Sequence, residues 1–250
     1  MIVVQDRVHE APLTAGELAE LLAARAAELA PAWAAQQPDL AARLMVALET
    51  DANLLLLPPM PYAEFLVWAA TSGESNHAEW IDGKVLRMTP APRRHQQLAL
   101  FLSRLLYDFV YRNRLGELYT APFQMRLAQP PRGREPDLLF VAAARVDRVR
   151  HTYLDGPADL VVEIVSPESA QRDRTEKYAE YEAAGVREYW LIDPDAQQAD
   201  FFRLGEDGRY GAVLRGRSGA YTSAVIPGFT LQVEWLWQDP LPPVWELGHA

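Results

Sequence analysis

The chain has 250 residues, of which 49% are apolar and 23% are charged, and its formal net charge is −10. This composition indicates a globular protein and excludes collagen-like and intrinsically disordered chains. No apolar stretch reaches the roughly eighteen residues of a membrane-spanning helix, and residues 1–10 lack the apolar segment of a secretory signal, so we expect a cytoplasmic protein without a membrane partner.

The chain contains no cysteine, and its five histidines are scattered. Thiolate zinc sites, cysteine nucleophiles and helical histidine pairs are therefore excluded. A bound metal would be held mainly by carboxylate and carbonyl oxygens, which are the ligands that suit Mg²⁺ or Mn²⁺.

The charge is distributed unevenly along the chain. Residues 1–83 carry 12 acids and 3 bases, residues 84–150 carry 13 bases and 5 acids, and residues 151–250 carry 17 acids and 8 bases. The total argues against a general nucleic-acid coat protein, but the basic middle segment is a candidate for a surface that faces a polyanion. An ordinary solvated basic face is the alternative.

Residues 14–50 are rich in alanine and predict two helices. Thr14 and Glu17 form a capping box, Pro31 ends the first helix, and Pro38 can occupy the first position of the second. No residue in this segment suggests chemistry. We therefore expect residues 1–59 to form a helical extension with a linker, which serves packing or oligomerisation.

Residues 60–237 predict an α/β domain around a mixed sheet, and residues 238–250 a C-terminal tail. We expect a helix from residue 61, a β-hairpin that turns at Asp82-Gly83, and a long amphipathic helix over residues 93–113. A helix with a capping box at Asp173 and Glu176 is expected to end at Gly185. Strands are expected at residues 117–128, 137–142, 159–165, 187–192, 199–204, 210–214 and 229–235.

Two acids are the first candidates for chemistry. Glu163 interrupts the apolar run of a buried strand, where a carboxylate must be paired, protonated or bound to a cation. Asp137 follows Pro136 at the entry of another strand. Two neighbouring strand carboxylates repel each other, and a divalent ion between them relieves the repulsion. A buried salt bridge at Glu163 and a simple turn at Asp137 are the alternatives.

Lys177 is conspicuous because the chain has 22 arginines and only two lysines. Lysine is a compact ammonium that can contact a single water or phosphate oxygen. We expect Lys177 in the first turn of its helix, where the helix dipole disfavours a cation. The alternative is a solvated lysine that pairs with Asp173, itself expected as the N-cap.

These residues resemble the Uma2 family, formerly a domain of unknown function, which is placed in the PD-(D/E)XK restriction-endonuclease-like nuclease superfamily. The resemblance covers about residues 60–237. The matching motifs are GPADLVVEIVSPES, then Asp173, Lys177, Tyr181, Gly185-Val186, Glu188-Tyr189-Trp190 and Asp193-Pro194, with Glu79-Trp-Ile-Asp82-Gly83 as the first hairpin and Glu135-Pro136-Asp137 as the PD element.

The resemblance implies a restriction-endonuclease-like core, a central mixed sheet flanked by helices. It also implies a divalent metal, Mg²⁺ or Mn²⁺, held by Asp137, Glu163 and the Ile164 carbonyl. The superfamily lysine usually stands two residues after the acid, where this chain has Val165. Lys177 fits a position moved onto the following helix, provided that residues 166–172 fold back over the strand end.

The resulting hypothesis is a metal-dependent endonuclease that hydrolyses DNA phosphodiesters, with Glu79 as a further catalytic acid or, alternatively, an edge-strand surface acid. A homodimer is expected, because two sites cut both strands of a duplex most simply. The alternatives are a non-catalytic module that binds nucleic acid or a protein, and hydrolysis of another phosphate ester. The candidate substrate-binding residues are Arg93, Arg94, His95, Gln124 and Tyr181. The first three could instead be solvated capping residues, and Tyr181 could be a core residue.

Overall fold

The computed structural model describes residues 54–55, 59–71, 77–88 and 90–247. The chain divides into two units, Met1–Leu57 and Pro58–Ala250. In the first unit only the short strand β1 (Leu54–Leu55) is described, so the two helices expected over residues 14–50 lie outside the described residues. All further elements belong to the second unit.

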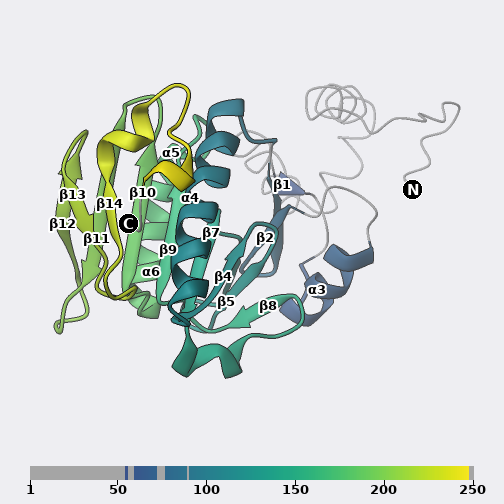
Figure 1. Ribbon diagram of the computed structural model, residues 1–250. Coiled ribbons are helices and arrows are strands. Elements are labelled where there is room, and N and C mark those ends of the chain that lie inside the picture. Colours follow the sequence, from purple (N-terminus) through teal and green to yellow (C-terminus); the bar gives the residue numbers. More distant parts are fainter. Residues whose placement is uncertain (1–53, 56–58, 72–76, 89, 248–250) are drawn as a thin grey trace, which may run out of the picture. The chain divides into compact units, whose positions relative to one another are not determined.

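The second unit is built around a mixed sheet with the order β12-β11-β10-β9-β7-β4 (Figure 1). Only the pair β9 and β10 is parallel, while the other neighbours are antiparallel. The expected mixed α/β fold is confirmed. The strands are β4 (Gly116–Thr120), β7 (Leu138–Ala142), β9 (Leu160–Ile164), β10 (Glu188–Asp193), β11 (Gln198–Leu204) and β12 (Tyr210–Gly216).

A second sheet, which the sequence patterns did not indicate, has the order β3-β2-β6-β5-β8 within this unit. β5 and β8 are parallel, and the other neighbours are antiparallel. The predicted hairpin at Asp82-Gly83 joins β2 and β3. The strands are β2 (Ala78–Ile81), β3 (Lys84–Arg87), β5 (Gln124–Leu127), β6 (Arg132–Arg134) and β8 (Tyr153–Asp155), and a separate hairpin contains β13 (Ala220–Thr222) and β14 (Thr230–Gln232).

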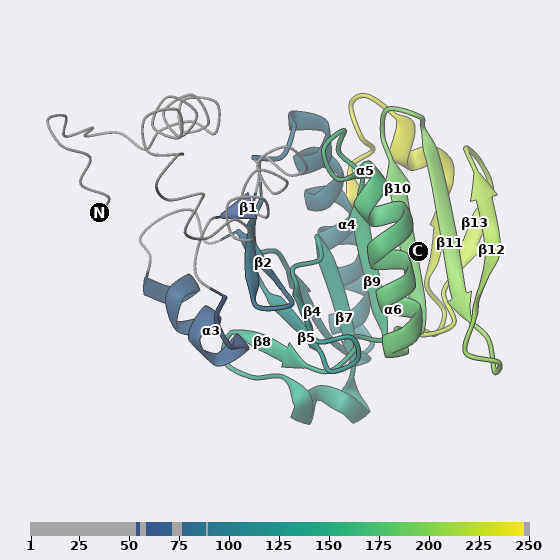
Figure 2. The same ribbon diagram turned by 180° about the vertical axis from the view of Figure 1, so that it is seen from behind.

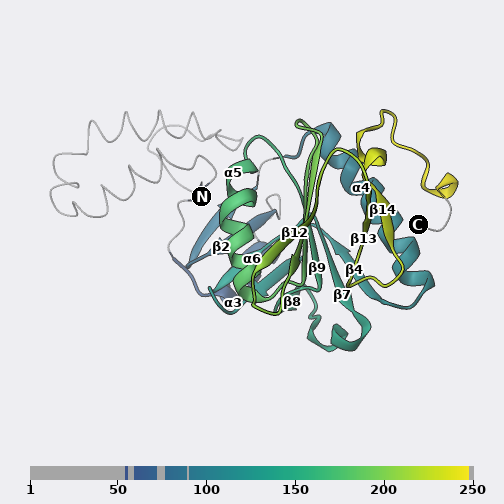
Figure 3. The same ribbon diagram turned by 90° about the vertical axis from the view of Figure 1, so that its left-hand side faces the viewer.

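Helices cover both faces of the central sheet. α4 and the β13–β14 hairpin lie on one face, and α5 and α6 lie on the other (Figure 3); α6 is in front in the view from behind (Figure 2). No described helix is long and apolar enough to cross a membrane. The helical segments are α3 (Tyr62–Thr71), α4 (Arg93–Arg112), η1 (Ala143–Arg148), α5 (Ala170–Arg172), η2 (Asp173–Lys177), α6 (Tyr178–Ala184), η3 (Val233–Trp237) and η4 (Val244–Glu246).

The alternation of β9 sets the direction in which Glu163 points. Val162 and Ile164 belong to the apolar cluster under α4, whereas Val161 and Val165 belong to the cluster on the α6 side. Successive strand residues face opposite sides of a sheet, so Glu163 shares the face of Val161 and Val165. A carboxylate is thereby directed into the layer between the central sheet and α6.

The helix after β9 differs from the prediction. It begins at Ala170 rather than after Asp173, and residues 173–177 form a π-helical turn before α6. Asp173 is buried, and its side chain makes no capping hydrogen bond to the backbone, so the predicted N-cap is wrong. Lys177 therefore lies inside the continuous helix and not in its first turn. The predicted end at Gly185 is confirmed by its left-handed φ of 86°.

Two predicted strands are shorter than expected. The strand expected over residues 117–128 is divided into β4 and β5, with the cis peptide Ala121-Pro122 between them. The strand expected over residues 229–235 becomes β14, followed by the 3₁₀ turn η3. The predicted helices from residue 61 and over residues 93–113 correspond to α3 and α4, and are confirmed.

Two glycines provide a test of this backbone. Gly116 has φ 152°, and a Cβ there would lie 2.0 Å from the Val141 carbonyl oxygen, whereas a Cβ on Gly185 would meet no atom within 4 Å. Gly185→Ala should cost roughly 1–2 kcal/mol through its backbone conformation alone. Gly116→Ala should cost more, because β4 must move away from β7. Denaturant unfolding of both variants checks this; equal losses would contradict the close approach of β4 and β7.

Candidate active site

The strand register brings Asp137 and Glu163 together. β7 and β9 are antiparallel, and Leu138 is paired with Val162, so the preceding Asp137 comes opposite Glu163. The Ile164 N–H donates to Asp137 Oδ2 at 2.7 Å. The two acids of the predicted pair are therefore neighbours at one end of the central sheet, where β9 ends and β7 begins.

Lys177 reaches this pair from the helix. Its ammonium lies 2.9 Å from Glu163 Oε1, 3.1 Å from Glu79 Oε1 and 3.4 Å from Asp173 Oδ1. The side chain is 1% exposed. The segment after β9 thus folds back as the moved lysine position requires, and Val165 packs in the apolar cluster on the α6 side.

Tyr181 orients the Glu163 carboxylate. Its hydroxyl donates to Glu163 Oε1 at 2.7 Å, and its ring is buried. Lys177 and Tyr181 are four residues apart on one helix, which places them on the same face. Both therefore hold the same carboxylate oxygen, and Tyr181 has a site contact as well as the core position that was its alternative.

Of the three substrate-binding residues predicted at the start of α4, only His95 contacts the site. His95 Nε2 lies 3.1 Å from Asp137 Oδ2. Burial lowers the pKa of His95, but the hydrogen bond and the charge of Asp137 outweigh this effect and raise the pKa. Arg94 instead donates to the carbonyl oxygens of Leu236 and Gln238, each at 2.8 Å, so its side chain is occupied by the fold. Arg93 is exposed at the first position of the helix.

Glu79 is buried, and the alternative of an edge-strand surface acid is wrong. Its carboxylate binds the Arg134 guanidinium at 2.7 Å in addition to Lys177. Arg134 also donates to both oxygens of Glu180, at 2.7 and 2.9 Å. Arg134 lies on β6 and Glu180 on α6, so this ion network joins the second sheet to the helix.

Gln124 lies in a neighbouring network. Its amide donates to Ala78 O at 2.7 Å and to Glu135 Oε2 at 3.0 Å, and His77 Nδ1 lies 2.7 Å from Glu135 Oε1. The structure gives Gln124 no direct hydrogen bond to Asp137, Glu163 or Lys177. No hydrogen bond to these three site residues therefore supports the predicted role of Gln124 in substrate binding.

The sequence patterns did not assign a site role to Asp173, Arg134 or Glu180. Asp173 satisfies the local pattern of a capping residue, and only its spacing of four residues from Lys177 indicated otherwise. Arg134 is one of 22 arginines, and Glu180 stands in a helix where an acid is ordinary. No local signal marks either as buried.

The buried layer contains more acid than base. Glu79, Glu163, Asp173 and Glu180 are buried with the two cations Lys177 and Arg134. Burial and the charges of Asp173, Asp137 and Glu79 together outweigh the opposing effect of Lys177 and raise the pKa of Glu163 to about 8. Asp173 Oδ1 is buried and receives no hydrogen bond. The site thus has the electrostatic character of a cation-binding site.

The residues present fit a divalent ion with oxygen ligands. Asp137 and Glu163 can supply one carboxylate each, and Ile164 can supply only its carbonyl, because its side chain packs in the cluster under α4. Within residues 59–71, 77–88 and 90–247, no three His, Asp or Glu side chains are grouped to hold a metal by themselves. Such a site would therefore include backbone and water oxygens, as Mg²⁺ sites commonly do.

The Uma2 family model, described as "Putative restriction endonuclease", matches residues 62–234. The chain belongs to the Uma2 family. The Uma2 fold is also found in a crystal structure described as "a putative nuclease belonging to DUF820 from Anabaena variabilis ATCC 29413", with a TM-score of 0.60 and 18% identity. That match covers 72% of this chain and 98% of the other. The comparison with curated proteins finds no match. Family and fold together support a nuclease.

Removal of the Lys177 charge should destabilise this Uma2 chain. Lys177→Met leaves buried carboxylates without their cation, which typically costs about 3–5 kcal/mol. A carboxyl group whose folded-state pKa is raised destabilises the fold as pH rises through that pKa. In wild type Glu163 ionises near pH 8 with Lys177 beside it, whereas in the variant it would ionise without this cation. The deficit against wild type should therefore grow as pH rises from about 6 to about 9.

Thermal or denaturant unfolding across this pH range measures the effect. Lys84→Met is the matched control, because Lys84 is the other lysine of the chain and is exposed. The same small, pH-independent change in both variants would contradict the buried ion network.

Proposed function

We propose that residues 60–237 form a metal-dependent endonuclease domain that hydrolyses DNA phosphodiester bonds. The observation that carries this proposal is the convergence of Lys177 with Glu163 beside Asp137, from three separate elements. Buried charges of this kind seldom add stability, since apolar residues of similar volume are usually as stable or more so. Their retention supports a catalytic role over the rival reading, a non-catalytic module that binds nucleic acid or a protein.

Each residue has a distinct task in this mechanism. Asp137 and Glu163, with the Ile164 carbonyl, would hold Mg²⁺ or Mn²⁺. A divalent ion bound there supplies a water of lowered pKa and offsets charge on the phosphodiester. Lys177 orients the attacking water or neutralises charge on the phosphate oxygens. Tyr181 fixes the Glu163 carboxylate by its hydrogen bond, and the N–H of Ile164 fixes Asp137.

Glu79 acts on the site through Lys177. Burial raises the pKa of Glu79, but Lys177 and Arg134 outweigh this and lower it to about 2. Glu79 is therefore an anion across the physiological range and holds Lys177 in its charged form. Burial lowers the pKa of Lys177, but the carboxylates of Glu163, Glu79 and Asp173 raise it above its ordinary value. Lys177 is thus a hydrogen-bond donor and a fixed charge rather than a proton acceptor.

The choice of DNA as the substrate rests on the basic segment and on the start of α4. Arg93 is exposed on the helix end that brings His95 to Asp137. Backbone N–H groups and a cation at a helix N-terminus favour a phosphate. The same site could hydrolyse another phosphate ester. A homodimer, a cytoplasmic location, and packing or oligomerisation by residues 1–59 remain predictions.

Substitutions at the converging residues should abolish cleavage. Glu163→Gln, Asp137→Asn and Lys177→Ala should each lower the rate of nicking of supercoiled plasmid by at least about 100-fold, because each removes a group that acts on the reacting atoms. The assay is run with Mg²⁺ and with Mn²⁺, and cleavage should stop when EDTA is added.

Glu234→Gln is the matched control, because Glu234 is an exposed acid on η3. We expect Glu234→Gln to have wild-type activity, and we expect the site variants to be folded but inactive. Equal activity in wild type, Glu163→Gln and Lys177→Ala would refute the site. Activity on a phosphomonoester or an RNA but not on plasmid would refute the substrate.

Neighbouring arginines at the start of α4 should behave differently. Arg93→Ala should weaken DNA binding by the Glu163→Gln protein and reduce the salt dependence of binding by about one phosphate contact. Arg94→Ala should instead lower the free energy of unfolding, because the Leu236 and Gln238 carbonyls lose their donor. Fluorescence anisotropy at several salt concentrations and thermal unfolding separate the two effects; reversed results would show that α4 does not meet the substrate as proposed.

A further inference from the structure

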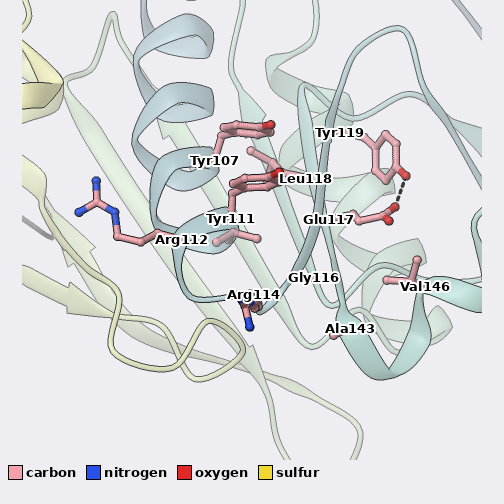
Figure 4. Close-up of a pocket in the computed structure, with 11 residues that line it drawn as sticks. Tyr107, Tyr111, Arg112, Arg114, Gly116, Glu117, Leu118, Tyr119, Ala143 and Val146 are labelled. Carbon is pink, nitrogen blue, oxygen red and sulfur yellow. Dashed lines mark hydrogen bonds between the residues drawn. The ribbon is translucent and has the colours of Figure 1, made fainter.

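A hollow of about 900 Å³ lies between the end of α4 and strand β4, away from the Lys177 site. Tyr107 and Tyr111 of α4 form one wall, and Ala143 and Val146 of η1 form the opposite side (Figure 4). Residues 116–119 of β4 lie between them and all line the hollow. Successive strand residues point to opposite faces, so a hollow lined by four of them in a row lies against the edge of the strand.

β4 is the last strand of the central sheet, and its outer backbone groups face this hollow. The Ala121 N–H donates to the Asp137 carbonyl, and the Leu115 carbonyl accepts from Ala143, so the odd-numbered residues are bonded toward β7. Backbone groups alternate in direction along a strand. The N–H and C=O groups of Gly116, Leu118 and Thr120 therefore point to the open edge.

The opposite end of the sheet is protected in a way that β4 is not. β12 carries a bulge where its register with β11 shifts at Phe201/Phe202, and a bulge discourages pairing with another strand. β4 has the sequence GELYT and continuous pairing with β7, without a bulge, a proline or a lysine. Of the two edge strands of the central sheet, β4 is therefore the one whose free backbone groups can pair with a further strand.

The surface beside this edge is apolar and carries both signs of charge. The rings of Tyr107 and Tyr111 are stacked with centroids 5.5 Å apart, and they are 51% and 71% exposed. The charged residues that line the hollow are Arg112, Arg114 and Glu117. Exposed aromatic rings and arginines are typical of protein interfaces, and an unpaired strand edge can bond to a strand of a protein partner. An interface between identical copies must be self-complementary.

We propose that a second copy of this chain docks here, with its β4 antiparallel to the first β4 and the two-fold axis at Leu118. Leu118 then exchanges both backbone hydrogen bonds with the partner's Leu118, and Gly116 pairs with the partner's Thr120. Glu117 comes opposite the partner's Tyr119, the same pair that is already hydrogen-bonded within one chain. The chain thus supplies its own matching strand.

This interface specifies how the homodimer expected for the proposed nuclease would form. Its consequence for catalysis rests on the proposed function. The two-fold axis is perpendicular to the joined sheet, so both copies of α4 lie on one face, where the exposed tyrosines meet. Asp137 lies one strand from β4 and beside Ala121. Standard strand spacings then place the two Asp137 residues roughly 25 Å apart, near the width of a DNA duplex.

The oligomeric state of the full chain tests the interface independently of any activity. Sedimentation velocity at micromolar concentration should show a dimer. Tyr107→Glu combined with Tyr111→Glu should weaken dimerisation at least about tenfold, because like charges then meet across the axis. Both positions are exposed, so the fold should persist. Val213→Glu is the matched control, because Val213 is half-exposed on β12, and it should remain dimeric.

Cross-linking tests the register. The chain has no cysteine, so Leu118→Cys introduces a single thiol, and paired strands bring two such residues within disulfide distance. Mild oxidation should join two Leu118→Cys chains and leave Val213→Cys chains separate.

A monomeric wild type, or a dimer that resists both the glutamate pair and cross-linking at 118, would overturn the proposal. So would a monomer whose DNA binding is lost in the glutamate pair, which would make the surface a nucleic-acid contact. An inactive but dimeric wild type would refute the nuclease and leave the interface standing.

Discussion

The structure depends on one buried ammonium that is shared between two sheets. Lys177 binds Glu163 on the central sheet and Glu79 on the second sheet, and the following helix α6 binds the second sheet through the Glu180–Arg134 ion pair. Because charges in a low-dielectric layer must be matched closely, this contact fixes the distance between the sheets and the rotation of the helix. The apolar cluster on the α6 side, which includes Val161, Tyr181 and Tyr189, packs around that fixed arrangement.

The contacts of Lys177 also show that the site contains an excess of negative charge. A lysine that only joined two layers would need one carboxylate, yet three lie within 3.4 Å of this one. Burial and the surplus negative charge raise the pKa of Glu163, and Asp173 Oδ1 is buried without a hydrogen bond. Such a layer is less stable alone than with an added cation. In the proposed function, the carboxylates that destabilise this layer are also the groups that bind the ion, as at many catalytic sites.

Sequence reasoning found the central acids because strand burial and lysine scarcity are local signals. It correctly expected the hairpin and the long helix. It made the convergence of Lys177 with Glu163 conditional on residues 166–172 folding back, and the structure meets that condition. It wrongly predicted Asp173 as an N-cap, because the pattern Asp-x-x-Glu fits a capping box whatever tertiary contacts the aspartate makes. It could not separate Arg93 from Arg94, because the carbonyl partners of Arg94 lie 142 and 144 residues away. The burial of Glu79 depends on a second sheet that local patterns do not specify.

The π-helical turn over Asp173–Lys177 changes which way the helix presents its side chains. A turn widened by one residue rotates everything beyond it by about 100° relative to an unbroken α-helix. Lys177 ends this turn and Tyr181 follows four residues later, so the turn sets the direction in which both side chains point. Deletion of one residue from this turn would restore ordinary helical phase and swing the ammonium away from the strand. The reach of the lysine is therefore encoded in the length of a turn as much as in the identity of a residue.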